Sequence, residues 1–224
     1  MEVVEEYMQG LYQSGLYPDK FICHQKQGNF VEVEDPADGK RYNLLTFCTN
    51  DVLGLVQSEA VRQAAIDSIV QYGTSNSSCS VLSGRIDLHR QLEQEISAFK
   101  HLPHTHLFLN AWMAMQALID GFCHLAINLP GFRNTRETLI LTDLLNHGCI
   151  LSAVTNASNR SGKMFSHSPD VRVKAYRHCD VNDLARKLRR YAKPNDRILV
   201  VSDAVFSMDG DIAPLPEMLD VLEN

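Results

Sequence analysis

Residues 197–211 read RILVVSDAVFSMDGD, an apolar run followed at once by small, acidic and glycine residues. The run from Arg197 to Ser202 predicts a strand, and the turn-forming residues from Asp203 to Asp211 predict where that strand ends. In open α/β sheets, ligands bind in the crevice outside the carboxyl ends of the strands. A hydroxyl group, that of Ser207, in a tight acidic turn at this position therefore indicates a small-molecule site.

The same kind of pattern repeats along the chain from Pro103 onward. The expected strands are residues 105–109, 139–142, 171–176 and 198–202, and the expected helices are residues 112–123, 149–155, 181–191 and 214–222. Alternation of strands with helices is typical of an α/β fold with a doubly wound, mainly parallel sheet. Residues 129–138 and 158–168 are expected to be surface loops.

The N-terminal part of the chain has a different pattern. We expect a helix over residues 3–12, strands at 30–33 and 42–47, a helix from the N-cap Ser58 to Tyr72, an irregular loop at 73–84 and a helix capped by Asp87. These signals predict two domains. Residues 1–57 would form an N-terminal arm with a small β element, and residues 58–224 would form the larger α/β part.

Composition narrows the class of protein. The 224 residues carry a net charge of −6 and are 45% hydrophobic, which is typical of a globular chain and offers no basic surface for nucleic acid. No apolar run approaches the roughly 18 residues needed to span a bilayer, and no signal peptide is visible. The 6 cysteines lack paired spacing, which favours free thiols in a reducing compartment. We therefore expect a cytoplasmic protein.

Three segments at expected strand ends carry residues suited to a flat, phosphate-bearing ligand. Ala111 and Trp112 begin a helix, where free N–H groups and the helix dipole attract anions. His147 follows the strand at 139–142 and carries an imidazole that can stack on a ring and exchange protons. Ser207 can donate a hydrogen bond. Taken singly, each residue also has an ordinary structural interpretation, namely a core indole, an incidental histidine and a turn serine.

Together with other motifs, these segments resemble the α-oxoamine synthases, which are pyridoxal-phosphate (PLP) enzymes. The matching segments are TNDVLGL (49–55), SGRIDLHRQLEQEISAF (83–99), LFLNAWMA (107–114), TDLLNHGCI (142–150), YRHCDVNDL (176–184) and SDAVFSMDGDIAPL (202–215). The resemblance runs in order from about Asn43 to Asn224. The last motif is the most specific, whereas the loop and phosphate-turn motifs are looser. The resemblance as a whole implies that residues 58–224 are a partial PLP-dependent transferase large domain.

The resemblance also implies roles for individual residues. The amides of Ala111 and Trp112 would receive the PLP phosphate, His147 would stack on the pyridine ring and act in catalysis, and Ser207 would bond the ring's O3′ side. Asn50 and Ser83 would border the substrate near a dimer partner. The implied reaction condenses an amino acid with an acyl-CoA thioester with loss of CO₂, using PLP as the electron sink. A homodimer is expected.

Several residues of this chain differ from the family motifs. Asn110 and Ala111 replace a Ser-Gly pair, the loop near Cys79 lacks the usual Arg, and Cys149 and Cys179 stand where Ser and Asn are usual. The family's pyridinium-binding Asp and Schiff-base Lys would follow Asn224. The 224-residue chain alone is therefore expected to be inactive and marginally stable. A lysine-lacking partner subunit of a complete homologue, or a gene fragment, is the alternative.

Other functions fit less well. His101, His104 and His106 cluster, but Pro103 interrupts them and no further ligand completes a standard metal spacing. No metal is expected. A dinucleotide site is excluded because no G-x-G-x-x-G follows the first strand of the sheet. An aminotransferase of the same fold remains an alternative, although the Ser-Met-Asp-Gly-Asp segment favours acyl transfer.

Overall fold

The computed structural model describes residues 2–15, 21–36, 38–124, 137–160 and 170–223. The chain divides into two compact units, residues 1–87 and residues 88–224. We treat each unit by itself. The domain boundary expected between residues 57 and 58 stays a prediction.

The first unit consists of a helix, an antiparallel sheet and a second helix. Its elements are α1 (Glu2–Gln13), β1 (Ile22–Gln27), β2 (Phe30–Glu34), β3 (Arg41–Leu45), the 3-10 turn η1 (Leu55–Gln57) and α2 (Glu59–Tyr72). The strands pair in the order β1-β2-β3. Gln57 ties η1 to the sheet, because its amide group bonds the Gly28 N–H at 3.2 Å and the Lys26 carbonyl at 2.7 Å.

The loop that follows α2 folds back on itself. Gly84 donates its N–H to the Cys79 carbonyl at 3.0 Å. A Cβ atom at Gly84 would lie 1.9 Å from the Ser78 carbonyl oxygen, so no other residue fits this backbone path. The Tyr72 hydroxyl donates a hydrogen bond to Asp87, which connects the two ends of the loop. This segment is irregular, as the sequence predicts, but it is internally bonded.

The second unit contains the α/β sheet. Its elements are α3 (Asp87–Lys100), α4 (Ala111–His124), β4 (Thr138–Asp143), α5 (Gly148–Arg160), β5 (Val171–Tyr176), α6 (Val181–Tyr191), β6 (Arg197–Val201) and α7 (Leu215–Glu223). The three strands are parallel and lie in the order β5-β4-β6. Every residue of β4 is buried, since this strand is paired on both sides.

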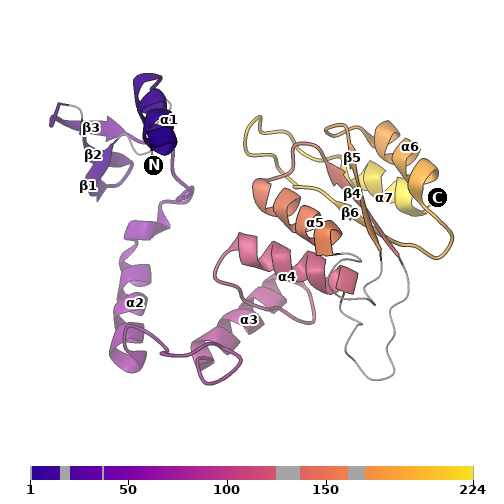
Figure 1. Ribbon diagram of the computed structural model, residues 1–224. Helices are drawn as coiled ribbons and strands as arrows, with labels where there is room; N and C mark the ends of the chain where they lie inside the picture. The colour runs from indigo at the N-terminus through magenta and orange to yellow at the C-terminus, as the bar shows by residue number, and fades with distance from the viewer. Residues whose placement is uncertain (1, 16–20, 37, 125–136, 161–169, 224) are drawn as a thin grey trace. The chain divides into compact units, whose positions relative to one another are not determined.

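Helices cover both faces of this sheet, as Figure 1 shows. Ile140 faces one way and packs with residues of α4 and α5, including Ile119 and Ala153. Leu139 and Leu141 face the other way and pack with Leu184 of α6 and with α7. This alternation follows from the period-two geometry of a strand. The predicted fold class, a doubly wound, mainly parallel sheet, is confirmed.

One predicted strand is absent from the described part of the chain, and two predicted helix caps differ from the structure. Residues 105–109 form no strand, because an extended segment needs a neighbouring strand for its hydrogen bonds and none lies beside it within the described residues. Ser58 is the N-cap of α2, but its side chain makes no capping bond. Asp87 is the first residue of α3 and not a cap before it.

Other differences are small. Strand β1 was not predicted, because ICHQKQ is polar and exposed along its whole length. Helix α5 extends to Arg160, past the predicted end at Thr155. The predicted loops at 129–138 and 158–168 fall mostly outside the described residues.

None of the helices in the described ranges is both long enough and apolar enough to cross a membrane.

The buried centre of β4 should control the stability of the second unit. Leu141 is fully buried between β5, β6 and the α6–α7 layer. We expect Leu141→Ala to lower the free energy of unfolding by about 2–5 kcal/mol, from lost burial and an unfilled cavity. Urea denaturation of the 224-residue chain measures this. The exposed Leu144→Ala is the matched control, with an expected change within about 0.5 kcal/mol. Equal effects of the two substitutions would contradict the described core.

Candidate functional site at the carboxyl ends of the strands

The connections of the parallel sheet place a change of direction beside β4. The chain leaves β4 into α5, which packs on one face, whereas it leaves β5 and β6 toward α6 and α7 on the other face. Adjacent strands whose following helices lie on opposite faces define a topological switch point. The segments after β4 and β6 therefore lead to helices on opposite faces, and they carry His147 and Ser207, which were predicted to act here.

Asn146 joins the segments after β4 and β6. Its buried side-chain amide donates to Thr142 Oγ1 at 2.9 Å and to the Val201 carbonyl at 2.8 Å, and its oxygen accepts the Asp203 N–H at 2.8 Å. Asp203 Oδ2 in turn accepts the His147 N–H at 2.6 Å. These bonds fix the backbone of His147 relative to the end of β6.

Trp112 lies beside the same segment. A Cβ atom added at Gly148 would be 3.8 Å from Trp112 Cζ3, so the indole lies near the backbone of the residue that follows His147. Asn110 caps α4 by accepting the Met113 N–H at 2.9 Å. The amides of Ala111 and Trp112 have no acceptor within the described part of the chain. They are the N–H groups that a helix start leaves available for an anion.

The exposed imidazole of His147 is oriented by Cys149. The Cys149 N–H donates to His147 Nδ1 at 3.2 Å, and Cys149 Sγ lies 2.9 Å from the same nitrogen. Because Nδ1 accepts from the backbone, the neutral ring carries its proton on Nε2. Cys149 is buried, so this support for the ring comes from the protein interior.

Ser207 lies at the tip of a short hairpin. Val205 and Ile212 form an antiparallel bridge, and within it the Phe206 N–H donates to the Asp211 carbonyl at 2.8 Å. Gly210 has φ of +77°, a conformation that favours glycine. Phe206 is buried, while Ser207 is exposed. The turn is therefore anchored by its flanks and presents the hydroxyl to solvent.

The structure places Trp112 near the residue that follows His147, and it bonds the segment after β4 to the segment that carries Ser207. Asn50 and Ser83 belong to the first unit, where both are exposed. Their proposed substrate contacts therefore stay predictions.

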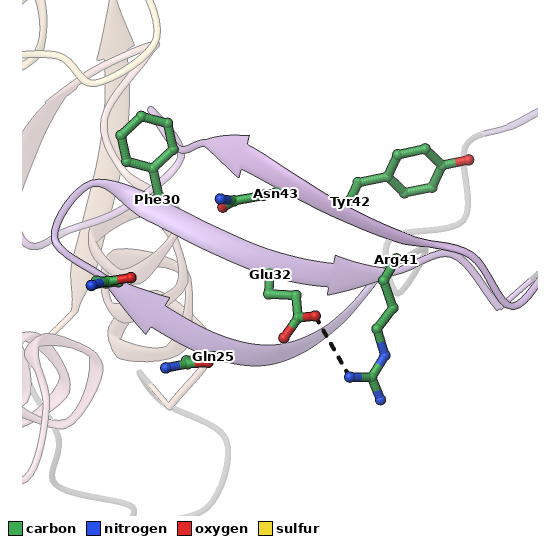
Figure 2. A pocket seen from close by; sticks show the side chains of 7 residues that line it. Gln25, Phe30, Glu32, Arg41, Tyr42 and Asn43 are labelled. Carbon is green, nitrogen blue, oxygen red and sulfur yellow. Dashed lines mark ion pairs between the residues drawn. The ribbon is translucent and has the colours of Figure 1, made fainter.

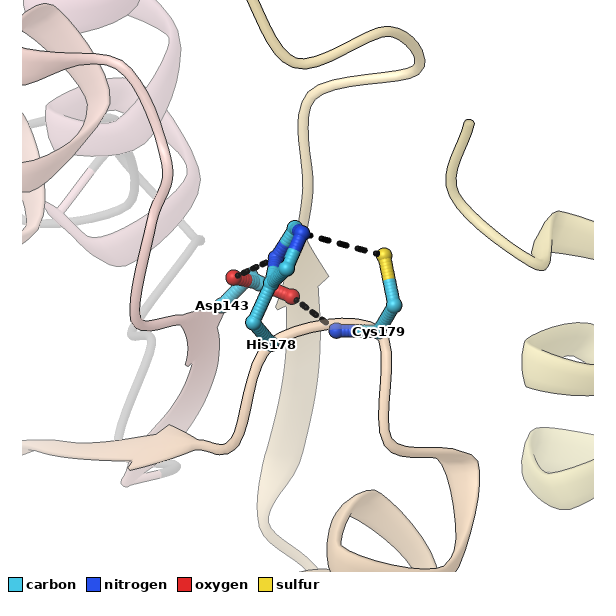
Figure 3. Close-up of side chains that lie close together, drawn as sticks. All are labelled: Asp143, His178 and Cys179. Atoms are coloured by element: carbon cyan, nitrogen blue, oxygen red, sulfur yellow. Dashed lines mark hydrogen bonds and ion pairs between the residues drawn. The ribbon is translucent and has the colours of Figure 1, made fainter. Parts of the chain in front are cut away.

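One group of side chains was missed by reasoning from the sequence. Asp143, His178 and Cys179 gather at the ends of β4 and β5, as Figure 3 shows. His178 Nδ1 lies 3.0 Å from Asp143 Oδ1, and the Cys179 N–H donates to Asp143 Oδ2 at 2.8 Å. Only the YRHCD segment hinted at this group, and it gave no sign of the partner on β4.

These three residues have ligand atoms close enough to suit a metal ion, all within 4.8 Å of one another. The hydrogen bonds favour another interpretation. Asp143 Oδ1 also accepts the Leu145 N–H at 2.8 Å, so both oxygens of this buried carboxylate are already bonded to protein donors. We therefore interpret the group as a hydrogen-bonded network.

A hollow of about 360 Å³ lies on one face of the β1-β2-β3 sheet (Figure 2). Polar side chains such as Gln25, Glu32 and Asn43 line it, and Arg41 pairs with Glu32 at 3.6 Å. Both partners of this ion pair are solvent-accessible, so it contributes only about 0–1 kcal/mol. This hollow is a polar, solvated sheet face and supports no catalytic assignment.

Comparison with known proteins identifies the class. Residues 42–224 match the family described as Aminotransferase class I and II, and the chain belongs to that family. Its relatives include an 8-amino-7-oxononanoate synthase of Fervidobacterium nodosum, 31% identical over 225 residues, and one of Methylobacillus flagellatus, 34% identical over 210 residues. These alignments cover 100% and 94% of this chain but 50% and 45% of the relatives. The chain thus spans about half the length of the curated relatives it matches.

Solved structures agree with the fold. A serine palmitoyltransferase from S. paucimobilis, with PLP and myriocin bound, aligns with a TM-score of 0.77 at 24% identity. That alignment covers 98% of this chain and 48% of the other. A Sphingomonas wittichii serine palmitoyltransferase gives the same TM-score at 22% identity. At these identities the likeness concerns the fold.

The bonds of Asn146 predict a specific sensitivity. Asn146→Ala removes the donor to the Val201 carbonyl and the acceptor of the Asp203 N–H, so we expect a loss of about 1–3 kcal/mol in the free energy of unfolding. The control is Asn156→Ala, which removes one exposed bond to Gln116 and should change stability by less than about 0.5 kcal/mol. Denaturant titration compares the two. If Asn146→Ala is as mild as its control, the two segments are not joined as described.

Proposed function

We propose that the second unit carries part of the PLP site of an α-oxoamine synthase. The observation that supports this most directly is the proximity of three segments: the start of α4, the segment after β4 and the segment after β6. Trp112 lies near Gly148, the His147 N–H donates to Asp203, and Asp203 begins the segment that carries Ser207. Family membership and the PLP-containing structures with this fold agree with the assignment.

The chemistry of the available groups fits this cofactor. A phosphate dianion needs clustered N–H donors, which the Ala111 and Trp112 amides provide at the positive end of the α4 dipole. A pyridine ring needs a flat partner, which the exposed His147 imidazole provides. A phenolate oxygen needs a donor, and the Ser207 hydroxyl is exposed for that purpose.

His147 also has a definite place for its proton. With Nδ1 engaged by Cys149, the proton of the neutral ring lies on Nε2, so that this atom can donate to a substrate carboxylate or ring substituent. PLP, when bound, supplies the electron sink for the reaction. The protein's own contribution in this unit is to bind the phosphate, orient the ring and hold that proton.

We further propose that the whole protein condenses an amino acid with an acyl-CoA thioester with loss of CO₂. The names of the relatives and the Ser-Met-Asp-Gly-Asp hairpin favour this reaction over amino-group exchange. A homodimer, a complex with a complete homologue and a cytoplasmic location are predictions that accompany the proposal.

Cofactor binding can be tested through Trp112, the only tryptophan of the chain. Pyridoxine 5′-phosphate is a suitable probe because it has no aldehyde and forms no Schiff base with surface lysines. We expect saturable quenching of Trp112 fluorescence, with unphosphorylated pyridoxine at least about tenfold weaker, since charge-assisted hydrogen bonds contribute about 1.5–3 kcal/mol.

Two variants sharpen this test. His147→Ala should weaken binding about 2- to 10-fold through lost ring stacking. His104→Ala, which changes an exposed loop histidine, should leave it unchanged. Quenching that is independent of the phosphate, or equal in both variants, would argue against the proposed site.

The reaction is tested with the full-length natural gene product. We expect amino-acid-dependent release of free CoA thiol together with an equal amount of CO₂ from a carboxyl-labelled amino acid. An aminotransferase would instead produce an oxo acid without consuming acyl-CoA. Formation of the oxo acid, with CoA release at background, would refute the proposed acyl transfer.

A further inference from the structure

The side chain of His178 lies between two carboxylates that belong to different strand ends. Its Nδ1 is 3.0 Å from Asp143 Oδ1 at the end of β4, and its Nε2 is 3.1 Å from Asp211 Oδ2 in the hairpin after β6. The ring also meets Phe206 edge-on, with centroids 4.4 Å apart and an interplanar angle of 86°. His178, which follows β5, therefore contacts two segments that are distant from it in sequence, the end of β4 and the hairpin after β6.

The two contacts define the charge on the ring. An ionised carboxylate only accepts hydrogen bonds, and a neutral imidazole donates from one nitrogen, so two such bonds require the imidazolium form. The ionisable groups that face the ring are Asp143, Asp211 and the adjacent Cys179. The bond to Asp143 and then that to Asp211 raise the pKa of His178 above its usual value. Burial, followed by the two carboxylates, raises the pKa of the Cys179 thiol, which favours its neutral form.

The position of these contacts along the hairpin is informative. Phe206 and Asp211 flank the Ser207 turn on its two sides, and they are joined by the bond from the Phe206 N–H to the Asp211 carbonyl. Asp143, on the other side of the ring, is 1% exposed and belongs to the central strand. His178 thus connects both flanks of the turn to the buried central strand of the sheet.

We propose that His178 is a positioning residue: as an imidazolium it ties the Ser207 turn to Asp143 and thereby sets where the Ser207 hydroxyl lies. The significance for catalysis rests on the proposed function, in which Ser207 contacts the cofactor. The tie itself is a property of the chain without any ligand.

The tie should depend on pH in a defined direction. A raised pKa means that the doubly bonded form is complete below the ordinary histidine pKa, about 6.5, and is lost as the pH rises through the higher pKa of the folded state. The neutral ring keeps one donor. Because Asp143 is buried and Asp211 is exposed to water, Asp211 is the partner released.

Histidine-resolved NMR of the 224-residue chain tests this from about pH 5 to about pH 9. We expect His178 to titrate above the ordinary histidine pKa, and the amide signals of Ser207 and Gly210 to shift with the same midpoint. Asp211→Asn should lower that midpoint and uncouple the turn signals from it. Asp209→Asn, which removes the same charge from the same turn, should leave both nearly unchanged. The proposal would be overturned if His178 titrated at the ordinary histidine pKa, or if the amide signals of the turn did not shift with the His178 midpoint.

A binding measurement separates this proposal from the proposed function. If the tie and the cofactor site are both correct, the affinity for pyridoxine 5′-phosphate falls several-fold as the pH rises through the His178 midpoint. The variant His178→Gln then binds this probe weakly at all pH values. If the turn follows His178 but the affinity does not, the tie stands and the cofactor role of Ser207 fails. Should His178→Gln not fold, Asp211→Asn gives the same comparison, because it changes only an exposed carboxylate.

Discussion

The pairing of β4 with β5 on one side and β6 on the other is the interaction on which the rest of the second unit depends. It buries the whole of β4 and aligns three carboxyl ends at one edge of the sheet. Polar residues can then lie close together there because the backbone beneath them is already satisfied. Asn146 and Asp143 use this platform, each bonding a different neighbouring strand end.

Hydrogen bonds between side chains and neighbouring segments follow two routes at this edge. One passes from Asn146 through Asp203 to the His147 backbone, and it involves no titrating histidine ring. The other passes from Asp143 through His178 to Asp211, and it needs a proton. His147 and Ser207 are therefore supported by different chemistry, even though both are proposed to face the same ligand.

Local patterns in the sequence predict much of this fold. Helix α6 is predicted at its observed bounds, Val181–Tyr191, because its apolar residues recur at helical spacing. The segment 105–109 is wrongly predicted, since its apolar composition suits a strand but a strand exists only with a neighbour. His147 and Ser207 are predicted as site residues because each lies in the segment that follows a strand. His178 and Asp211 cannot be found in this way, because they meet across 33 residues and no spacing rule relates them.

The loop between α2 and α3 has a consequence for assembly. A hydrogen bond between Tyr72 and Asp87 joins the two ends of the loop. Inside the loop, the backbone of Gly84 packs so closely on the backbone of Ser78 that no side chain would fit there. A segment held in this way has already lost most of its conformational freedom. Binding of a ligand or another subunit to this loop would therefore cost less conformational entropy than binding to a flexible loop.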